Sequence, residues 1–405
     1  MASILFTWEI GEGSGHIAPY LAVIRELEAR GHEVSFACKY VSRAFPLFAG
    51  TRVRYVQAPY VQSPPAEQAA PIDSFAKILN NCGYSNVPQL AGMIRAWRNL
   101  FELVKPDLIV ADYSPTAVLA SRESGIPRLQ IGNGFFQVPT QGRIPTLAEL
   151  QGLKHDDPHI FGFQNRILSH INAALELNGM AKVGLFQETQ QAERKLFTTF
   201  KELDHYPERE PAEYIGPLNA VRGAEPEWPE GDGAKVFAYL KPFPTLGQLF
   251  MQLNQKKLRT LIYPDGIPEK LMREHASATL RFVDKPLDMP RIGETADFAV
   301  HNGNHGTTCE LMLAGLPSLV LPLHAEQSIM GRHLQLLGAG LSFVEKTADQ
   351  FHQGLSALSR EDGYRQAARA FADRHRDFDR QQPVQTVLAA IDALLAYASS
   401  SAQRA

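Results

Sequence analysis

The chain has 405 residues, of which 44% are hydrophobic and 20% charged, with a formal net charge of −3. This composition is typical of a globular protein with room for two domains, and the charge argues against nucleic acid as a partner. Cys38, Cys82 and Cys309 are far apart in the sequence, so we expect reduced thiols in a cytoplasmic protein. A monomer and a homodimer both stay open. No run reaches the ~18 apolar residues of a transmembrane segment, which leaves only peripheral membrane contact open.

The first elements predicted along the chain form a βαβ unit. They are a strand (4–8), a glycine-rich turn (9–16), an amphipathic helix (19–30) and a second strand (32–38). Such a unit implies parallel strands joined by a right-handed crossover. A dinucleotide fingerprint is disfavoured, because it requires G-x-G-x-x-G and an acid after the second strand, where this chain has G-x-G-x-G and Lys39.

The rest of the first half is less regular. Apolar patterns predict strands at 52–57, 107–111 and 127–131 and helices at 87–104 and 114–124. The loop 132–142 then carries Phe135 and Phe136. Residues 161–191 are predicted to be mostly helical, and we expect them to shape a substrate pocket.

A segment rich in Gly, Pro and Glu, residues 220–233, is the best linker candidate. The pattern beyond it predicts a second βα series. Its strands are expected at 235–240, 258–263, 278–283, 297–301 and 318–321, with a helix at 246–255. Residues from 354 onward are predicted to be helical, and they end in an amphipathic helix at 383–397.

The stretch 301–327 joins two of these strands. Its loop contains Gly303 and Gly306 and leads into a helix, so free backbone N–H groups lie at a helix N-terminus, which suits an anion. Glu326 and Gln327 then place a carboxylate beside an amide at the mouth of the next strand. The stretch indicates a ligand with both phosphate and sugar, and the alternative is an ordinary strand–turn–helix of a doubly wound sheet.

His16 closes the glycine-rich turn, where an imidazole can accept a proton near neutral pH. Asp112 ends a buried strand, and from the residues alone it is as well suited to cap a helix as to hold a histidine. Glu9 and Glu12 flank the turn and are alternatives as the base. For both, a solvated loop carboxylate is the favoured interpretation.

Two stretches resemble signatures of the family 1 glycosyltransferases (the UDP-glycosyltransferase superfamily) of the GT-B fold, in particular the bacterial macrolide and natural-product type. The donor signature, H-G-G-x-G-T-x-x-E, G-x-P and P-x-x-x-[DE]-Q, is matched at Gly303, Gly306, Thr307, Glu310, Gly315, Pro317, Pro322, Glu326 and Gln327. The N-terminal signature, G-x-G-H-x-x-P followed by R-G-H-E-V, is matched around His16. The resemblance implies that His16 is the catalytic base and that Asp112 orients it.

Three positions depart from the family pattern. Asn302 stands where the family has its phosphate-binding histidine, with His301 one residue early, and Asp284 stands where a tryptophan stacks on the nucleobase. Lys241 begins a loop that usually starts with Gly-Ser or Gly-Thr, and it could supply the phosphate charge that Asn302 lacks. The donor-binding residues implied are Gly15, Lys241, Phe282, Asn302, Gly303, Gly306, Thr307, Thr308, Glu310, Glu326 and Gln327.

The resemblance implies two Rossmann-like domains facing across a cleft. We expect an acceptor-binding domain (1–219), a linker (220–233), a nucleotide-sugar domain (234–380) and a C-terminal helix (381–405) that packs back on the first domain. The implied reaction is inverting transfer of a hexose from a UDP- or dTDP-sugar to a hydroxyl of a small apolar acceptor. Acceptor-binding candidates are Trp8, Glu12, Tyr113, Phe135 and Phe136, with core packing as the alternative for the aromatic residues.

Neither a metal nor a cofactor beyond the nucleotide-sugar co-substrate is expected, because helix dipoles and backbone amides do the work of a cation in this fold. Asp377-Phe-Asp379 and the stretch 155–159 are better interpreted as solvated polar segments. Two alternative functions stay open. One is an N-acetylglucosaminyltransferase of the same fold with a lipid acceptor, and the other is a non-catalytic nucleotide-sugar-binding protein.

Overall fold

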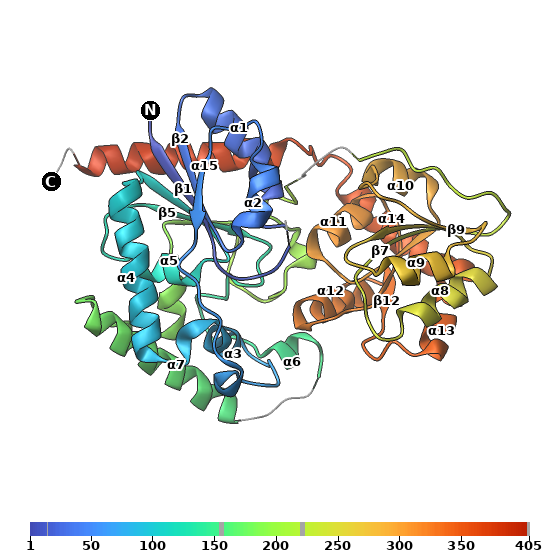
Figure 1. Cartoon of the computed structure of the whole chain (residues 1–405), viewed down its shortest axis with the longest axis horizontal. Coiled ribbons are helices and arrows are strands. Elements are labelled where there is room, and N and C mark those ends of the chain that lie inside the picture. The colour runs from blue at the N-terminus through green and yellow to red at the C-terminus, as the bar shows by residue number, and fades with distance from the viewer. Residues whose placement is uncertain (14, 154–157, 219–222, 403–405) are drawn as a thin grey trace. The chain divides into compact units, whose positions relative to one another are not determined.

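The computed structural model describes residues 1–13, 15–153, 158–218 and 223–402 (Figure 1). The chain divides into an N-terminal unit, Met1–Ala220 with Asp379–Ala405, and a C-terminal unit, Val221–Phe378. Each unit is built on one six-stranded sheet flanked by helices. The prediction of an α/β protein with two doubly wound domains is confirmed.

The sheet of the N-terminal unit has the strand order β3-β2-β1-β4-β5-β6, and its strands pair in parallel. The strands are β1 (Ser3–Trp8), β2 (Glu33–Cys38), β3 (Arg54–Gln57), β4 (Leu108–Asp112), β5 (Arg128–Gly132) and β6 (Arg194–Phe197). The two central strands β1 and β4 are buried almost throughout, as strands covered on both faces must be. Their neighbouring carboxyl ends, at Trp8 and Asp112, are paired in register.

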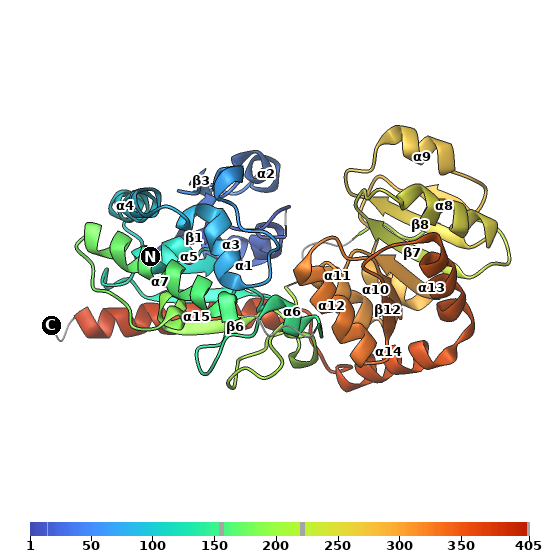
Figure 2. The same cartoon turned by 90° about the horizontal axis from the view of Figure 1, so that it is seen from below.

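Helices of the N-terminal unit form two groups. Contacts join α4 to α5 and α7, and they join α1 to α15, which in turn lies along β4 and β5 (Figures 1 and 2). The main helices are α1 (Leu21–Ala29), α2 (Val41–Leu47), α3 (Phe75–Leu79), α4 (Val87–Val104), α5 (Pro115–Ala120), α6 (Leu147–Leu150), α7 (Pro158–Leu177) and α15 (Gln382–Ala402). Short helices are η1 (Ala18–Tyr20), η2 (Pro65–Glu67), η3 (Asn80–Tyr84), η4 (Phe186–Gln190) and η5 (Lys201–Leu203). The C-terminal helix therefore packs within the N-terminal unit.

The sheet of the C-terminal unit has the order β12-β11-β10-β7-β8-β9 and is also parallel. Its strands are β7 (Lys235–Leu240), β8 (Arg259–Pro264), β9 (Leu280–Phe282), β10 (Phe298–His301), β11 (Ser318–Val320) and β12 (Gly340–Ser342). Its helices are α8 (Leu246–Gln255), α9 (Glu269–His275), α10 (Met289–Thr295), α11 (His305–Leu313), α12 (Ala325–Leu336), α13 (Ala348–Arg360) and α14 (Asp362–Arg374).

Alternate residues of β7 show how this sheet is covered on both faces. Val236 and Ala238 belong to a core that also contains Leu249 of α8. Phe237, between them in sequence, belongs to a second core with Ile292 of α10. Because successive side chains of a strand point to opposite faces, the two cores lie on opposite sides of the sheet.

Sequence analysis did not predict β6, β12 and several helices, among them α9, and α5 is shorter than predicted. β6 has the sequence RKLF, in which only the last two residues are buried, and β12 has three residues. α9 buries none of its residues, so it carries no apolar period. α5 ends at Ala120, three residues before Glu123, which has a φ of 68° that a helix cannot accommodate.

The segment predicted as a linker, 220–233, is described from residue 223 onward. The backbone N–H of Ala224 donates to Pro286 O (2.8 Å), and its carbonyl accepts from the N–H of Asp288 (2.8 Å). The indole of Trp228 donates to Thr295 Oγ1 (3.0 Å). This part of the segment is therefore attached to the C-terminal unit.

Candidate active site

The glycine-rich turn follows β1 and is shaped by its glycines. Gly11 and Gly13 have φ values of 96° and 85°, which residues with a side chain rarely adopt. A Cβ built on Gly11 would overlap His16 Nε2, whereas one on Gly13 would meet nothing within 4 Å. Glycine at position 11 therefore leaves room for the imidazole. Gly15 is exposed, with open space around it.

Lys39, at the end of β2, braces the same turn. Its ammonium group donates to Gly11 O (3.0 Å) and to Glu12 Oε1 (2.9 Å). The hydroxyl of Tyr40 also donates to Glu12 Oε1 (2.9 Å). Glu12, a predicted acceptor contact, is thus a partner of Lys39 and Tyr40 in this structure.

His16 and Asp112 are brought together by the parallel pairing of β1 and β4. His16 Nδ1 lies 2.9 Å from Asp112 Oδ2, and 16% and 8% of the two side chains are exposed. An ionised carboxylate can only accept, so Nδ1–H is the donor and Nε2 is left with its lone pair for a substrate proton. The N-cap of α5 is Ser114, so Asp112 does not occupy the alternative position considered for it.

Two aromatic rings flank the imidazole. The rings of Trp8 and His16 are stacked, with centres 5.1 Å apart and planes at 18°, and the ring of Tyr113 lies 4.6 Å away. Trp8 is fully buried, and its indole N–H donates to Ile10 O (2.7 Å). Trp8 therefore packs on His16, and its burial favours the core-packing alternative, while its part in acceptor binding stays a prediction.

Tyr20, in η1, is a contact of Asp112 that sequence analysis missed. Burial and the Asp112 carboxylate raise the pKa of the Tyr20 phenol well above its usual value, and the phenol donates a hydrogen bond to that carboxylate. The sequence feature that could have indicated this contact is the position of Tyr20, four residues after His16 and directly before helix α1. Asp112 is thus held by a neutral hydroxyl as well as by the imidazole.

Glu9 is buried, which contradicts the expectation of a solvated loop carboxylate. Its carboxylate accepts from the backbone N–H groups of Thr116 (3.2 Å) and Ala117 (2.6 Å) at the start of α5. Burial raises the pKa of Glu9 to about 8, against the opposing effect of these hydrogen bonds. Only 2% of the residue is exposed, so Glu9 has no access to a substrate as an alternative base.

The remaining acceptor candidates lie beyond Tyr113. The ring centres of Tyr113 and Phe136 are 3.5 Å apart in an edge-on arrangement, and Phe135 packs against Phe136 at 5.0 Å. A small cavity adjoins them and is lined by residues of β4, β5, the loops after these strands, α5 and η4: Ala111, Tyr113, Ser114, Pro115, Gln130, Ile131, Gly132, Phe136, Gln137 and Gln190. Aromatic residues and amides therefore meet next to the histidine.

In the C-terminal unit, the turn between β10 and α11 is the place where the sequence predicted an anion site. The N-cap residue Asn304 makes no side-chain hydrogen bond to the first turn of α11, and Gly306 in that turn is exposed. Thr307 is half-buried, whereas the hydroxyl of the buried Thr308 donates to Asn304 O (3.0 Å). The first-turn backbone N–H groups, with the positive end of the helix dipole, are suited to a phosphate.

Asn302 and Gln327 brace this turn. Asn302 Oδ1 accepts from the backbone N–H of Lys241 (2.7 Å), and its Nδ2 donates to Leu321 O (2.8 Å). Gln327 Oε1 accepts from the N–H of Leu323 (2.8 Å), while Nε2 donates to Asn304 Oδ1 (2.7 Å). Both residues are almost wholly buried and their amides are hydrogen-bonded within the protein, so their direct contact with a donor stays a prediction.

Neither histidine at this turn supplies a positive charge. Burial lowers the pKa of His301 to about 3, and its Nδ1 accepts from the N–H of Gly303 (3.0 Å). Burial, together with His333, lowers the pKa of His305 to about 3. A Cβ on Gly303 would lie 2.9 Å from Gln327 O, which accounts for glycine there.

Lys241 is the cation at the end of β7. Its side chain is 34% exposed, and its ammonium group lies 3.6 Å from Asp265 Oδ2. Burial lowers the pKa of His324. The carboxylate of Glu326 opposes this effect and the ammonium group of Lys241 adds to it, so these three side chains interact electrostatically. Glu326 and Glu310 are half-buried, as is Phe282, whose ring lies 5.4 Å from that of Phe250.

Within the described ranges, no three His, Cys, Asp or Glu side chains are grouped so as to hold a metal ion. Residues 155–157 of the polar stretch considered for a metal lie outside those ranges. None of the helices in the described part of the chain combines the length and the apolar character needed to cross a bilayer.

No family model matches the sequence. An uncharacterized glycosyltransferase of Methanosarcina mazei is 24% identical over 349 residues, 82% of this chain and 83% of that protein. A PGL/p-HBAD biosynthesis rhamnosyltransferase of Mycobacterium bovis is 24% identical over 383 residues, 88% of this chain and 81% of that protein.

Solved structures share the fold over nearly the whole chain. The calicheamicin glycosyltransferase CalG4 matches with a TM-score of 0.71 at 15% identity, covering 98% of each chain. The spinosyn rhamnosyltransferase SpnG, complexed with thymidine diphosphate, matches with a TM-score of 0.65 at 17% identity, covering 96% of this chain and 99% of that one. The chain is therefore a glycosyltransferase of the GT-B fold, and it is similar to the family 1 enzymes of natural-product glycosylation.

Proposed function

We propose that the protein is an inverting glycosyltransferase in which His16 removes a proton from the acceptor hydroxyl. A hydroxyl is a poor nucleophile until its proton is taken, and the free Nε2 of His16 is placed to take it. Asp112 fixes the tautomer and stabilises the imidazolium that forms. The observation that carries this proposal is the 2.9 Å hydrogen bond between His16 Nδ1 and Asp112 Oδ2.

The departing nucleoside diphosphate is stabilised by the C-terminal unit. The uncapped first turn of α11 offers backbone N–H groups to the phosphates, as an oxyanion hole does for a developing charge. Lys241 supplies the positive charge, because His301 and His305 are neutral and Asn302 is occupied in bracing the turn. Glu326 is half-buried at the start of α12, and its carboxylate accepts hydrogen bonds from hydroxyls of the donor sugar.

The donor is a dTDP- or UDP-hexose, including a deoxyhexose such as rhamnose. Structures similar in fold are complexed with thymidine diphosphate, and one sequence relative is named as a rhamnosyltransferase. The acceptor is a small apolar molecule with a free hydroxyl. Its binding surface includes Tyr113 and Phe136, which pack next to His16.

The test is a transfer assay with full-length protein. dTDP-glucose, dTDP-rhamnose and UDP-glucose are each incubated with 2-naphthol, 4-nitrophenol or benzyl alcohol, and the anomeric configuration of the product is read by NMR. The proposal predicts a glycoside whose anomeric centre is inverted relative to the donor. A product with retained configuration, or binding of every donor without transfer to any acceptor, contradicts it.

A further inference from the structure

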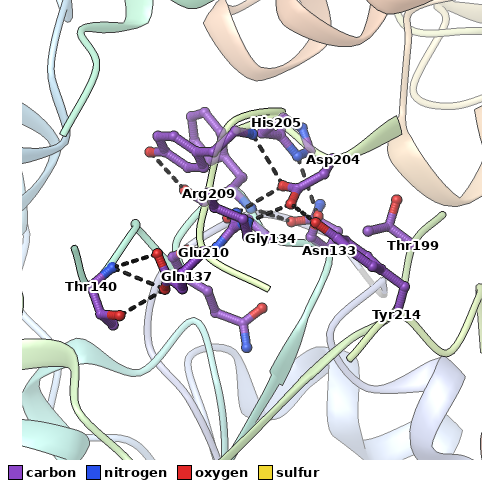
Figure 3. A network of polar contacts seen from close by, with 12 residues as sticks. Asn133, Gly134, Gln137, Thr140, Thr199, Asp204, His205, Arg209, Glu210 and Tyr214 are labelled. Carbon is purple, nitrogen blue, oxygen red and sulfur yellow. Dashed lines mark hydrogen bonds and ion pairs between the residues drawn. The ribbon is translucent and has the colours of Figure 1, made fainter. Parts of the chain in front are cut away.

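A segment far along the chain encloses the loop that carries Phe135 and Phe136. We name residues 133–140 the acceptor loop and residues 204–214 the frame (Figure 3). The frame donates to three successive parts of the loop: Arg209 to Gly134 O (3.1 Å) and Gln137 O (2.5 Å), and Tyr206 to Phe135 O (3.2 Å). Backbone groups of the loop are thus tied down from its start to its middle.

At the end of the acceptor loop the direction of hydrogen bonding is reversed, because the loop donates and the frame accepts. The backbone N–H of Thr140 donates to both carboxylate oxygens of Glu210 (3.0 and 3.2 Å), and its hydroxyl donates to Oε1 (2.7 Å). Two consecutive frame residues therefore hold the loop. Arg209 donates to loop carbonyls, and Glu210 accepts from the N–H and hydroxyl of Thr140 at the end of the loop.

Arg209 is itself fixed inside the unit. It forms a bidentate pair with Asp204, and only 1% and 0% of the two side chains are exposed. Tyr214 OH donates to Asp204 Oδ2 (2.7 Å), and the guanidinium lies 4.4 Å from the centre of the Phe197 ring. A buried ion pair is stable only when its remaining donors and acceptors are satisfied, and here the loop carbonyls satisfy them.

Close approach of the two segments also requires a glycine. Gly134 has a φ of 93°, and a Cβ there would lie 2.8 Å from Asp204 Oδ1. A side chain at this position would separate the acceptor loop from the frame. The loop is therefore seated on the frame mainly by its backbone, with the Thr140 hydroxyl on Glu210 and the Phe135 ring 5.2 Å from that of His205 as side-chain contacts.

The loop transmits this position to the base through ring contacts. Phe136 packs on Tyr113 with ring centres 3.5 Å apart, and Tyr113 packs on His16 at 4.6 Å. Tyr113 has a left-handed backbone, with a φ of 48°, so its orientation depends on such support.

We infer that the frame holds the acceptor loop in its binding conformation before substrate arrives, so that acceptor selectivity is set by a preformed wall. This inference rests on the proposed function, because it assigns the loop to the acceptor side of the same reaction. Arg209 is a positioning residue in this account and does not touch the substrate. The alternative is a frame that only stabilises the fold.

The first part of the test measures the loop itself by amide hydrogen exchange of the full chain. Arg209→Lys keeps the charge opposite Asp204 but loses the fork that reaches two carbonyls, and Tyr206→Phe removes one hydroxyl at nearly constant volume. Arg54→Lys is the matched control, since Arg54 pairs with Glu33 at the exposed surface of the same unit, outside both segments. Exchange of residues 133–140 should accelerate about tenfold or more in Arg209→Lys, less in Tyr206→Phe and not in the control.

The second part measures transfer to 2-naphthol and benzyl alcohol from the donor that the wild type uses. Arg209→Lys should raise the KM for the acceptor by about tenfold and reduce the preference between the two acceptors, with donor Kd unchanged. Should Arg209→Lys fail to fold, Tyr206→Phe should show the same pattern at smaller amplitude. Faster exchange with unchanged acceptor KM and preference would overturn the inference, as would unchanged exchange. If the wild type transfers sugar to none of 2-naphthol, 4-nitrophenol and benzyl alcohol, the proposed function fails, and the inference fails with it.

Discussion

The imidazole of His16 lies almost parallel to the indole of Trp8, with 5.1 Å between ring centres and 18° between planes. The indole is locked by its own hydrogen bond to Ile10 O and by complete burial. If His16 is the base, as proposed, proton transfer from the acceptor makes the imidazole cationic, and this ring face would stabilise the charged form. The stacking therefore gives Trp8 a testable part in the proposed reaction. The predictions that follow concern this pair, its glycine-rich turn, Glu9, and Lys241 of the C-terminal unit.

Replacement of Trp8 should affect kcat more than KM. Trp8→Leu removes the aromatic face and should lower kcat by about tenfold, with donor KM unchanged, since cation–π stabilisation is lost only when charge develops. Trp8→Phe retains a ring and should keep kcat within about threefold. Steady-state kinetics together with the Tm of each variant check this, and an equal loss of kcat in both variants at equal Tm would refute the stacking role.

Gly11→Ala should damage the enzyme far more than Gly13→Ala. Both glycines have positive φ, so each substitution costs backbone strain of about 1 kcal/mol or more. Only the Cβ at position 11 meets His16 Nε2. We expect kcat/KM to fall about 100-fold or more for Gly11→Ala and by less than about threefold for Gly13→Ala at a matched loss of Tm. Equal effects on kcat/KM would show that the turn responds only to strain.

Glu9 should make the stability of the protein pH-dependent. Its pKa is raised from 4.5 to about 8, so the folded state favours the neutral carboxyl. The stability it contributes is fully present below pH 4.5 and is lost as the pH rises through about 8, by an amount on the order of a few kcal/mol. The Tm of Glu9→Gln should therefore fall less than that of the wild type between about pH 5 and about pH 9. Glu102→Gln, at an exposed position of α4, is the control and should follow the wild type.

Lys241→Ala should weaken donor binding. The loss of a phosphate-pairing cation should raise the Kd for dTDP by about tenfold, and Lys241→Arg should restore most of the affinity. Lys270→Ala removes an exposed cation from α9 of the same unit and should leave Kd unchanged. Isothermal titration calorimetry at two salt concentrations is the measurement. An unchanged Kd for Lys241→Ala would remove Lys241 from the donor site.

Much of the architecture could be predicted because the strands are apolar runs separated by turns, and the parallel order follows from the βαβ pattern. The meeting of His16 and Asp112 was predictable for the same reason, since β1 and β4 end at one edge of a sheet. The burial of Glu9 was not, because it depends on where the N-terminus of α5 packs, which no local pattern encodes.

The turn between β10 and α11 shows a second limit of sequence patterns. Asn302 and Gln327 occupy positions that suggest ligand contact, yet their amides bind Lys241, Leu321, Leu323 and Asn304. A polar side chain beside a site can form hydrogen bonds with backbone groups as readily as with a ligand. The sequence alone does not distinguish these two roles. The frame was also missed, because its contacts join segments about 70 residues apart without any periodic signal.

The most direct test of the central claim is the turnover rate of His16→Ala with the donor and acceptor that the wild type uses. If His16 is the base, kcat should fall by a factor of about 10² to 10⁴ while the Kd for the nucleoside diphosphate is unchanged. A variant that folds, binds the nucleotide and transfers sugar at the wild-type rate would contradict the account.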